Sequence, residues 1–153
     1  MSHNPYAAPE ATLAEATKGT VALYSPTQAA LGALLGGPVG LIYFLHRNFV
    51  ALGNQPMAKK CLIFGALLIV VLLIVLPLLP ASFPNAPLNI LYILGARSIA
   101  QKYQLTKQAI VESTEYTFKS NWNVFGMGLL CFLGSVVVVI GPLMGLEALG
   151  LIK

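Results

Sequence analysis

Long stretches of apolar residues alternate with short polar connections along the chain and predict helices of membrane-spanning length. Residues 19–46, 61–96 and 120–146 contain no Asp, Glu, Lys or Arg. A helix needs roughly 20 mostly apolar residues to cross a hydrocarbon core. A soluble domain of this size normally distributes charged side chains over its whole surface. The pattern therefore indicates an all-α, polytopic membrane protein.

The first apolar segment is predicted over residues 27–45, after a serine and a proline that suit the start of a helix. We expect its small residues and its proline to pack closely against other helices: Gly32, Gly36, Gly37, Pro38 and Gly40. Because proline removes a backbone hydrogen bond, a kinked span is the favoured interpretation. A re-entrant hairpin broken at residues 36–38 is the alternative, and it would have to be buried against other helices.

Three further spans are predicted over residues 61–79, 87–104 and 122–146. We expect the third to begin apolar and to continue beyond the bilayer as an amphipathic helix. One polar stripe at helical spacing is expected to contact lipid or a partner: Arg97, Gln101, Gln104 and Gln108. In the last span, Trp122 is predicted to be an interfacial anchor with a similar contact role. Three glycines are predicted to pack this span against other helices: Gly126, Gly128 and Gly134.

The distribution of basic residues favours four spans. If residues 87–104 cross, the connections at 46–60 and 97–120 share one side and carry seven Lys or Arg, whereas only Lys18 and Lys153 lie on the other side. If they do not cross, the split is four against five. Lys and Arg concentrate in cytoplasmic loops, so crossing is favoured. The predicted fold is a four-helix transmembrane bundle over residues 26–153, preceded by a disordered tail over residues 1–25.

The residues that usually carry chemistry are sparse, and we predict no catalytic, cofactor-binding or metal-binding residues. The two histidines, His3 and His46, are far apart in the sequence, and Cys61 and Cys131 both lie within apolar segments. A metal site or a nucleophile with its base would need such groups clustered. The net charge of +4 is explained by topology, so no nucleic-acid partner is expected. The chain is therefore not expected to be an enzyme.

Polar side chains within the spans distinguish two functions. Besides Arg97, the strongly polar residues there are Asn89, Asn123 and Ser135. If they converge on a water-accessible cavity, a small oligomeric transporter or channel component is favoured. If they face separate helices or lipid headgroups, a non-catalytic accessory or immunity-type protein is favoured. Such a protein would act through contact of its glycine-lined first helix with a second copy or with a membrane complex.

Several short motifs resemble those of a group of small, uncharacterised bacterial multi-pass membrane proteins. They are Ser25-Pro-Thr-Gln-Ala, Leu35-Gly-Gly-Pro-Val-Gly, Arg47-Asn-Phe with Leu52-Gly53, and Lys119-Ser-Asn-Trp-Asn with Gly126-Met-Gly128. The resemblance covers most of the chain from Ser25 onward. It implies a multi-pass protein of the bacterial inner membrane, and it implies no activity, because the group has none assigned.

Overall fold

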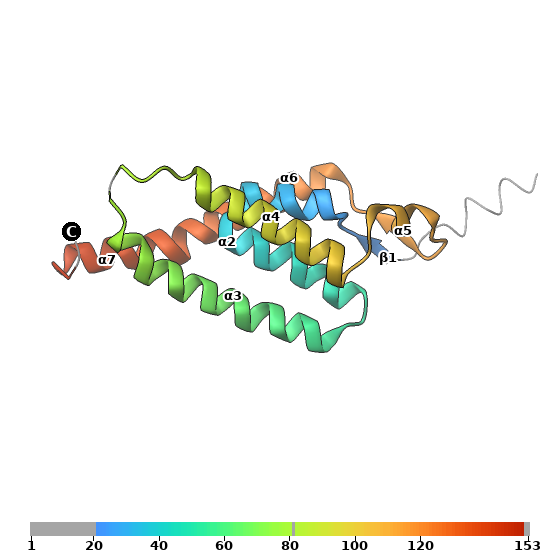
Figure 1. Cartoon of the computed structure of the whole chain (residues 1–153), viewed down its shortest axis with the longest axis horizontal. Helices are drawn as coiled ribbons and strands as arrows, with labels where there is room; N and C mark the ends of the chain where they lie inside the picture. Colours follow the sequence, from blue (N-terminus) through green and yellow to red (C-terminus); the bar gives the residue numbers. More distant parts are fainter. Residues whose placement is uncertain (1–20, 81, 152–153) are drawn as a thin grey trace, which may run out of the picture.

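The computed structural model describes residues 21–80 and 82–151. The chain is mostly helical, as predicted, with one small sheet. Its elements in order are β1 (Val21–Leu23), α2 (Pro26–Ala51), α3 (Gln55–Val75), η1 (Leu76–Leu78), α4 (Ala86–Tyr103), α5 (Lys107–Glu112), β2 (Tyr116–Phe118), α6 (Asn121–Ser135), the π-helical η2 (Val136–Ile140) and α7 (Gly141–Ala148) (Figure 1).

Three stretches of the described chain are long and apolar enough to cross a membrane. By length and composition these are Pro26–Ala51, Gln55–Leu78 and Asn121–Ala148. The predicted span at 87–104 corresponds to α4, whose 18 residues are less apolar and do not reach the same criterion. A multi-pass membrane protein is thus compatible with the structure, whereas the predicted number of four spans is not confirmed.

The first helix begins where the sequence predicts. Ser25 is its N-cap, and its hydroxyl accepts a hydrogen bond from the backbone N–H of Gln28. The Gln28 side chain accepts one in return from the backbone N–H of Ser25, which completes a capping box. Pro26 occupies the first helical position, where no backbone donor is needed.

Helix α2 reverses its direction at Gly37, whose φ of 60° and ψ of −146° lie outside the helical region. In a straight helix Tyr24 and Asn48 would be about 36 Å apart. Instead, the backbone N–H of Tyr24 donates a hydrogen bond of 2.9 Å to the Asn48 side chain. A Cβ added to Gly40 would lie 2.5 Å from the carbonyl oxygen of Gly32. Residues 26–36 and 38–51 are therefore two antiparallel arms of a helical hairpin, which Figure 1 shows side by side.

The hairpin corrects the favoured prediction of one kinked span over residues 27–45. At 1.5 Å per residue the arms are about 16 and 21 Å long, so neither reaches across a hydrocarbon core of about 30 Å. The structure has the hairpin shape of the alternative interpretation. Glycine is needed at position 37 because its φ lies in the left-handed region, which side chains with a Cβ avoid.

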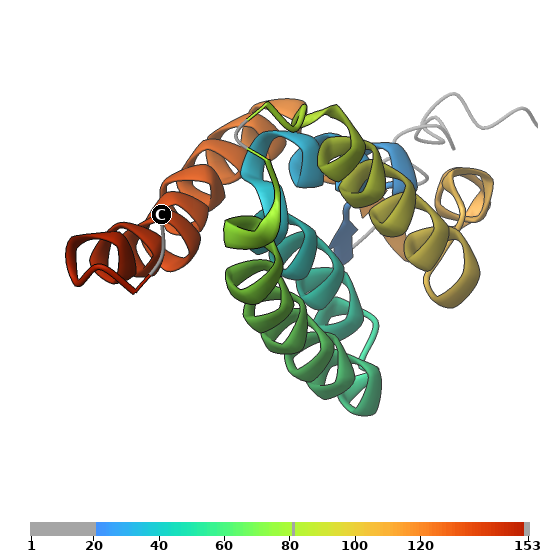
Figure 2. The same cartoon turned by 60° about the vertical axis from the view of Figure 1, so that its left-hand side comes forward.

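The other helices surround the hairpin. Helix α2 packs against α3, α4 and α6. The main hydrophobic cluster joins Tyr24 with the second arm and with α3, α4 and α6, and contains Tyr24, Ala29, Phe44, Leu45, Phe49, Ala58, Ala100 and Val124. Figure 2 shows α3 and α4 diverging on either side of the second arm. At the hairpin tip itself Gly36 and Pro38 are buried, as a non-helical segment at membrane depth would require.

A short parallel sheet ties the start of the described chain to the segment before α6. Val21–Leu23 pair with Tyr116–Phe118, and Val21 lies opposite Tyr116. The backbone N–H of Lys119 extends the ladder by donating to the Leu23 carbonyl. The predicted tail over residues 1–25 is therefore wrong for Val21–Ser25, and residues 1–20 lie outside the described chain. A strand of three residues is too short to show the alternation of apolar and polar side chains by which strands are recognised in a sequence.

The predicted amphipathic extension of the third helix is also corrected. Helix α4 ends at Tyr103, and Gln104 has an extended backbone with φ of −122° and ψ of −154°. A new short helix, α5, then begins with Thr106 as its N-cap. Gln104 and Gln108 are consequently not on one helix, and the expected polar stripe is divided. At the end of α4 the Gln104 side chain points inward, where it bonds with the Asn48 side chain and donates to the Leu45 carbonyl.

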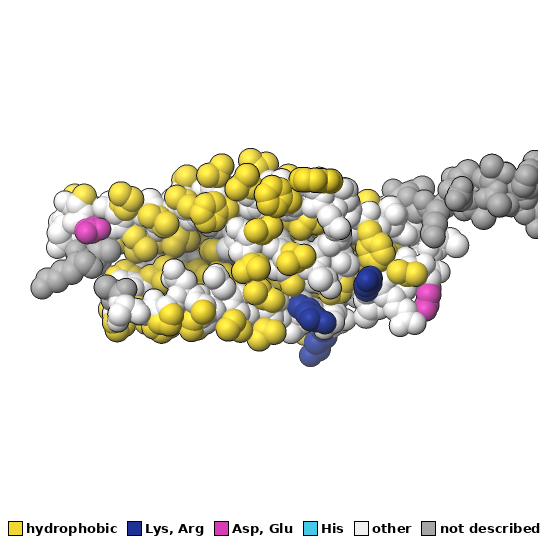
Figure 3. Space-filling view, turned by 90° about the horizontal axis from the view of Figure 1, so that it is seen from above, with side chains coloured by type: hydrophobic (Ala, Val, Ile, Leu, Met, Phe, Trp, Pro, Cys, Tyr) yellow, Lys and Arg dark blue, Asp and Glu magenta, His cyan; other side chains and the backbone are white. Residues whose placement is uncertain are grey.

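The described basic residues gather mostly toward one end of the molecule. This end holds β1, the α2–α3 turn and the α4–α6 connection, which also carries Glu112 and Glu115, whereas Glu147 lies toward the opposite end. Figure 3 shows dark-blue side chains toward one end of a surface with many yellow side chains, and acidic side chains near both ends. We name the end with the dark-blue side chains the basic end. Its basic residues are Arg47, Lys59, Lys60, Lys102, Lys107 and Lys119.

Candidate functional site

The hairpin tip is closed by a serine from another helix. Ser135, at the last position of α6, donates a hydrogen bond of 2.6 Å to the Gly36 carbonyl. Its oxygen also accepts one of 3.2 Å from the backbone N–H of Val39. Both backbone groups lie where the helical ladder is broken. Ser135 therefore replaces the helical partners that the Gly36 carbonyl and the Val39 N–H lose because the chain reverses at Gly37.

Glycines allow the hairpin and α6 to approach closely. A Cβ on Gly36 would lie 2.7 Å from the Cβ of Cys131, and one on Gly128 would lie 3.1 Å from the Leu35 side chain. Between the arms, a Cβ on Gly32 would overlap the ring of Phe44. The predicted packing role of these positions agrees with the contacts, although Gly32 and Gly40 serve contact within α2 and not contact between separate helices.

Four other glycines differ in how closely neighbouring atoms approach them. Gly134 would place its Cβ at an ordinary 3.5 Å from Val39, whereas Gly126 would meet no atom within 4 Å. A packing role for Gly126 within this chain is therefore not found. Gly141 and Gly145, one turn apart on α7, also meet no atom within 4 Å and are exposed. The glycines of α2 are thus in contact with other parts of the chain, whereas Gly141 and Gly145 of α7 are exposed on the described surface.

A buried polar network joins the hairpin to α4 at the basic end. The amide nitrogen of Asn48, a residue that is 3% exposed, donates to the Tyr24 carbonyl at 2.7 Å and to the Gln104 side chain at 2.9 Å. Gln104 in turn donates to the carbonyl of Leu45. Sequence reasoning missed Asn48. A single asparagine next to Arg47 looks in the sequence like one exposed to solvent, and nothing nearby marks it as buried.

The start of α6 is held against the start of α2 by a second group of polar bonds. The side-chain amide of Gln28 donates to the Lys119 carbonyl at 2.7 Å and to Asn121 at 2.8 Å. The hydroxyl of Tyr24 donates to Asn123 at 2.6 Å. Burial raises the pKa of the Tyr24 phenol, so the hydroxyl keeps its proton and remains a donor. Asn123 therefore ties α6 to the segment between β1 and α2.

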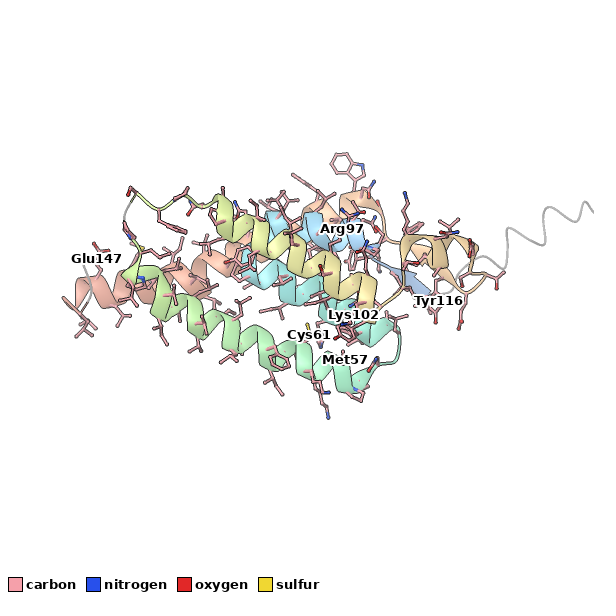
Figure 4. All side chains as sticks on the ribbon, viewed as in Figure 1. Met57, Cys61, Arg97, Lys102, Tyr116 and Glu147 are labelled. Atoms are coloured by element: carbon pink, nitrogen blue, oxygen red, sulfur yellow. The ribbon has the colours of Figure 1, made fainter. Side chains whose placement is uncertain are left out.

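The predicted contact residues separate into two groups. Arg97, Gln101, Gln108 and Trp122 are exposed, and Trp122 is 81% exposed at the start of α6. Gln104 instead belongs to the inward network. Figure 4 shows Arg97 and Lys102 along α4 toward the basic end, with Glu147 at the opposite end. The lipid or partner contact of the first group stays a prediction.

An apolar groove of about 530 Å³ lies between α3, α4 and the second arm of α2. It lies toward the basic end, where Figure 4 places Met57 and Cys61 on α3 near Lys102 on α4. We call it the α3–α4 groove. Its lining residues are Leu41, Ile42, Leu45, Phe49, Met57, Lys60, Cys61, Phe64, Gly65, Leu68, Ile99 and Tyr103.

A second cavity, of about 370 Å³, lies at the hairpin tip. Gly37, Pro38 and Ser135 line it together with Asn89 of α4. Two of the four polar residues that the sequence marks within the spans thus share a cavity, whereas Asn123 bonds to Tyr24 and Arg97 is exposed. The four residues do not converge on one site.

The described residues hold no cluster of metal-binding side chains. Over residues 21–80 and 82–151, no three His, Cys, Asp or Glu are close enough to hold a metal ion. In the same part of the chain, every buried side-chain nitrogen and oxygen has a hydrogen-bond partner. The polar groups in the interior are therefore already committed to holding the fold.

The chain was compared with protein-family models, with curated proteins and with solved structures, and none of them matches it. The resemblance to small bacterial membrane proteins therefore stays a prediction.

Proposed function

We propose that the chain is a multi-pass protein of the bacterial inner membrane with three crossing segments and one re-entrant hairpin. Helix α3, helix α4 and the α6–α7 segment cross, and α2 enters and leaves on one side. The charge distribution supports this topology, because the basic end then faces the cytoplasm. Helix α4 is about 27 Å long, which suffices when basic residues near its end extend toward the headgroups.

The proposed role is non-catalytic: helix–helix association with a second copy or with a larger membrane complex. The observation that carries it is the pair Gly141 and Gly145, which lie exposed at the four-residue spacing that lets two helices approach closely in lipid. The glycines of α2, which the sequence favoured for this role, are occupied by contacts within the chain. The partner surface is therefore assigned to α7.

Association can be tested by labelling one population of the protein with a donor dye and another with an acceptor dye in the same vesicles. We expect energy transfer above the level of random mixing, and we expect Gly145→Leu to reduce it to that level. Gly95→Leu is the matched control, because Gly95 also meets no atom within 4 Å but lies on α4. Equal loss in both variants, or no transfer in the unmodified protein, would count against a self-associating α7. If self-association fails, co-purification of another membrane protein that Gly145→Leu abolishes would show that α7 binds a different partner.

An alternative is a small oligomeric transporter or channel component. It is favoured by one observation, the cavity at the hairpin tip that Asn89 and Ser135 line. A conducting path would need more polar groups than this cavity offers from one copy. Vesicles containing the protein should therefore show no ion or small-solute flux above that of empty vesicles. Flux that Asn89→Leu abolishes would instead establish the alternative.

A further inference from the structure

The α3–α4 groove is lined mostly by apolar residues and carries one charged side chain, which is exposed. Of its twelve lining residues, Lys60 is the one with a charged side chain. The volume of about 530 Å³ lies within the range of roughly 300–1,000 Å³ that is typical of ligand sites. In the proposed topology it opens within the bilayer, so its natural occupant is apolar.

The charged residues around the groove favour one kind of apolar ligand over another. Lys60 lies on the first turns of α3, next to Lys59, at the basic end. On the facing wall, Tyr103 lines the groove, and the ammonium of Lys102 lies 5.5 Å from the centre of its ring. A transmembrane helix seated here would withdraw Lys60 from water without supplying an anion. A phospholipid in the adjacent leaflet instead places its phosphate at the height of these lysines.

The walls of the groove are formed and closed by the chain itself. Gly65 on α3 lies against the side chain of Ile42, which brings α3 and the second arm together at the inner part of the groove. The thiol of Cys61 approaches the Ile42 carbonyl at 3.6 Å. At the rim, Phe64 is 64% exposed and Tyr103 is 49% exposed. The groove is thus closed on the hairpin side and open toward lipid.

We propose that the α3–α4 groove holds one acyl chain of an anionic glycerophospholipid from the cytoplasmic leaflet, with the lipid phosphate paired to Lys60. The apolar walls hold the acyl chain, and Lys60 provides selectivity for an anionic headgroup. This proposal rests on the membrane location of the chain and is independent of the association through α7.

The test places a single tryptophan at the groove rim and quenches its fluorescence with brominated lipids. In a Trp122→Phe background, Phe64→Trp reports on the groove, and Ile63→Trp reports on the neighbouring lipid-facing side of α3, since Ile63 is 67% exposed and does not line the groove. Tyr103→Trp gives a second groove reporter from α4. Each variant is reconstituted with brominated phosphatidylglycerol or brominated phosphatidylcholine.

We expect the groove reporters to prefer phosphatidylglycerol about fivefold over phosphatidylcholine, the effect of one lysine near a membrane surface. The Ile63→Trp reporter should show no preference. Lys60→Gln should abolish the preference, whereas Lys59→Gln, which changes an adjacent lysine outside the groove lining, should keep it. Soluble glycerol phosphate should not compete, because it lacks the acyl chain.

Three results would overturn the proposal. An equal preference for phosphatidylglycerol at the groove and control reporters would indicate that the groove contacts only the lipid that surrounds the whole protein. A preference that survives Lys60→Gln would assign selectivity elsewhere. Groove reporters that neither lipid quenches would show that protein, from this chain or another, fills the groove.

Discussion

The hydroxyl of Ser135 donates a 2.6 Å hydrogen bond to the carbonyl oxygen of Gly36, across the contact between α6 and the hairpin tip. The same oxygen accepts from the backbone N–H of Val39. One side chain thus replaces two main-chain partners at a point where the helix is broken. In lipid these groups have no water to bond with, so the fold of α2 depends on α6.

Removing this hydroxyl should destabilise the protein. Ser135→Ala leaves the Gly36 carbonyl and the Val39 N–H without that partner, and we expect the free energy of unfolding to fall by about 1–2 kcal/mol. Unfolding in mixed detergent micelles would measure the change. Ser98→Ala, at an exposed position on α4, is the control and should change it by less than about 0.5 kcal/mol. Equal values for the two variants would contradict the role given to Ser135.

Adding one methyl group between the hairpin arms should also be costly. In Gly40→Ala the new Cβ would meet the backbone oxygen of Gly32 at 2.5 Å, and a backbone atom cannot rotate away. We expect a loss of about 1–3 kcal/mol in the free energy of unfolding, as in overpacked cores. Gly126→Ala meets no atom within 4 Å and should be neutral or slightly stabilising, because alanine favours a helix. A tolerated Gly40→Ala would show that the arms are not in contact.

Two glutamines that the sequence places on one stripe should differ sharply when they are mutated. Gln104→Ala removes the bonds to Asn48 and to the Leu45 carbonyl, so buried groups lose their partners. The expected loss is about 1–3 kcal/mol in the free energy of unfolding. Gln101→Ala, at an exposed position, should have little effect on the same measurement. Similar losses of unfolding free energy in both variants would contradict the inward position of Gln104 and favour the continuous polar stripe.

The hairpin makes a topological prediction that a straight first helix does not share. Single cysteines at Thr27, Gln55 and Gln108, in a background without the native cysteines, should react with a membrane-impermeant thiol reagent from one side of the membrane. A cysteine at Asn85 should react from the other side. All four positions are exposed. If α2 crossed, Thr27 would react from the side opposite to Gln55.

Much of the helical content could be predicted from hydrophobicity alone. The segment after Cys61 is so apolar that its helix follows from length and composition, and the N-cap at Ser25 follows from its proline neighbour. These features are local, because each depends on residues within a few positions of one another. The predicted spans at 61–79 and 122–146 agree with helices in the structure for this reason.

The reversal at Gly37 could not be decided in the same way. A Gly-Pro pair in an apolar segment is compatible with a kink or with a hairpin, and the choice depends on whether a distant residue satisfies the broken backbone. Ser135 does so, but nothing in its local sequence marks it. The same holds for Gln104, whose helical spacing from Arg97 suggested an exposed stripe, and whose actual orientation is set by Asn48 on another helix.

The closure of the hairpin by Ser135 has a consequence for biogenesis. The bond joins positions that are 99 residues apart, so the ribosome releases both arms of α2 well before it has made the residue that completes their turn. Each arm is also too short to be retained in the bilayer as an independent transmembrane segment. In the proposed topology, stable insertion of α2 is therefore coupled to the insertion of α6, and a nascent chain truncated before Ser135 should present an incomplete hairpin to the cell's membrane proteases.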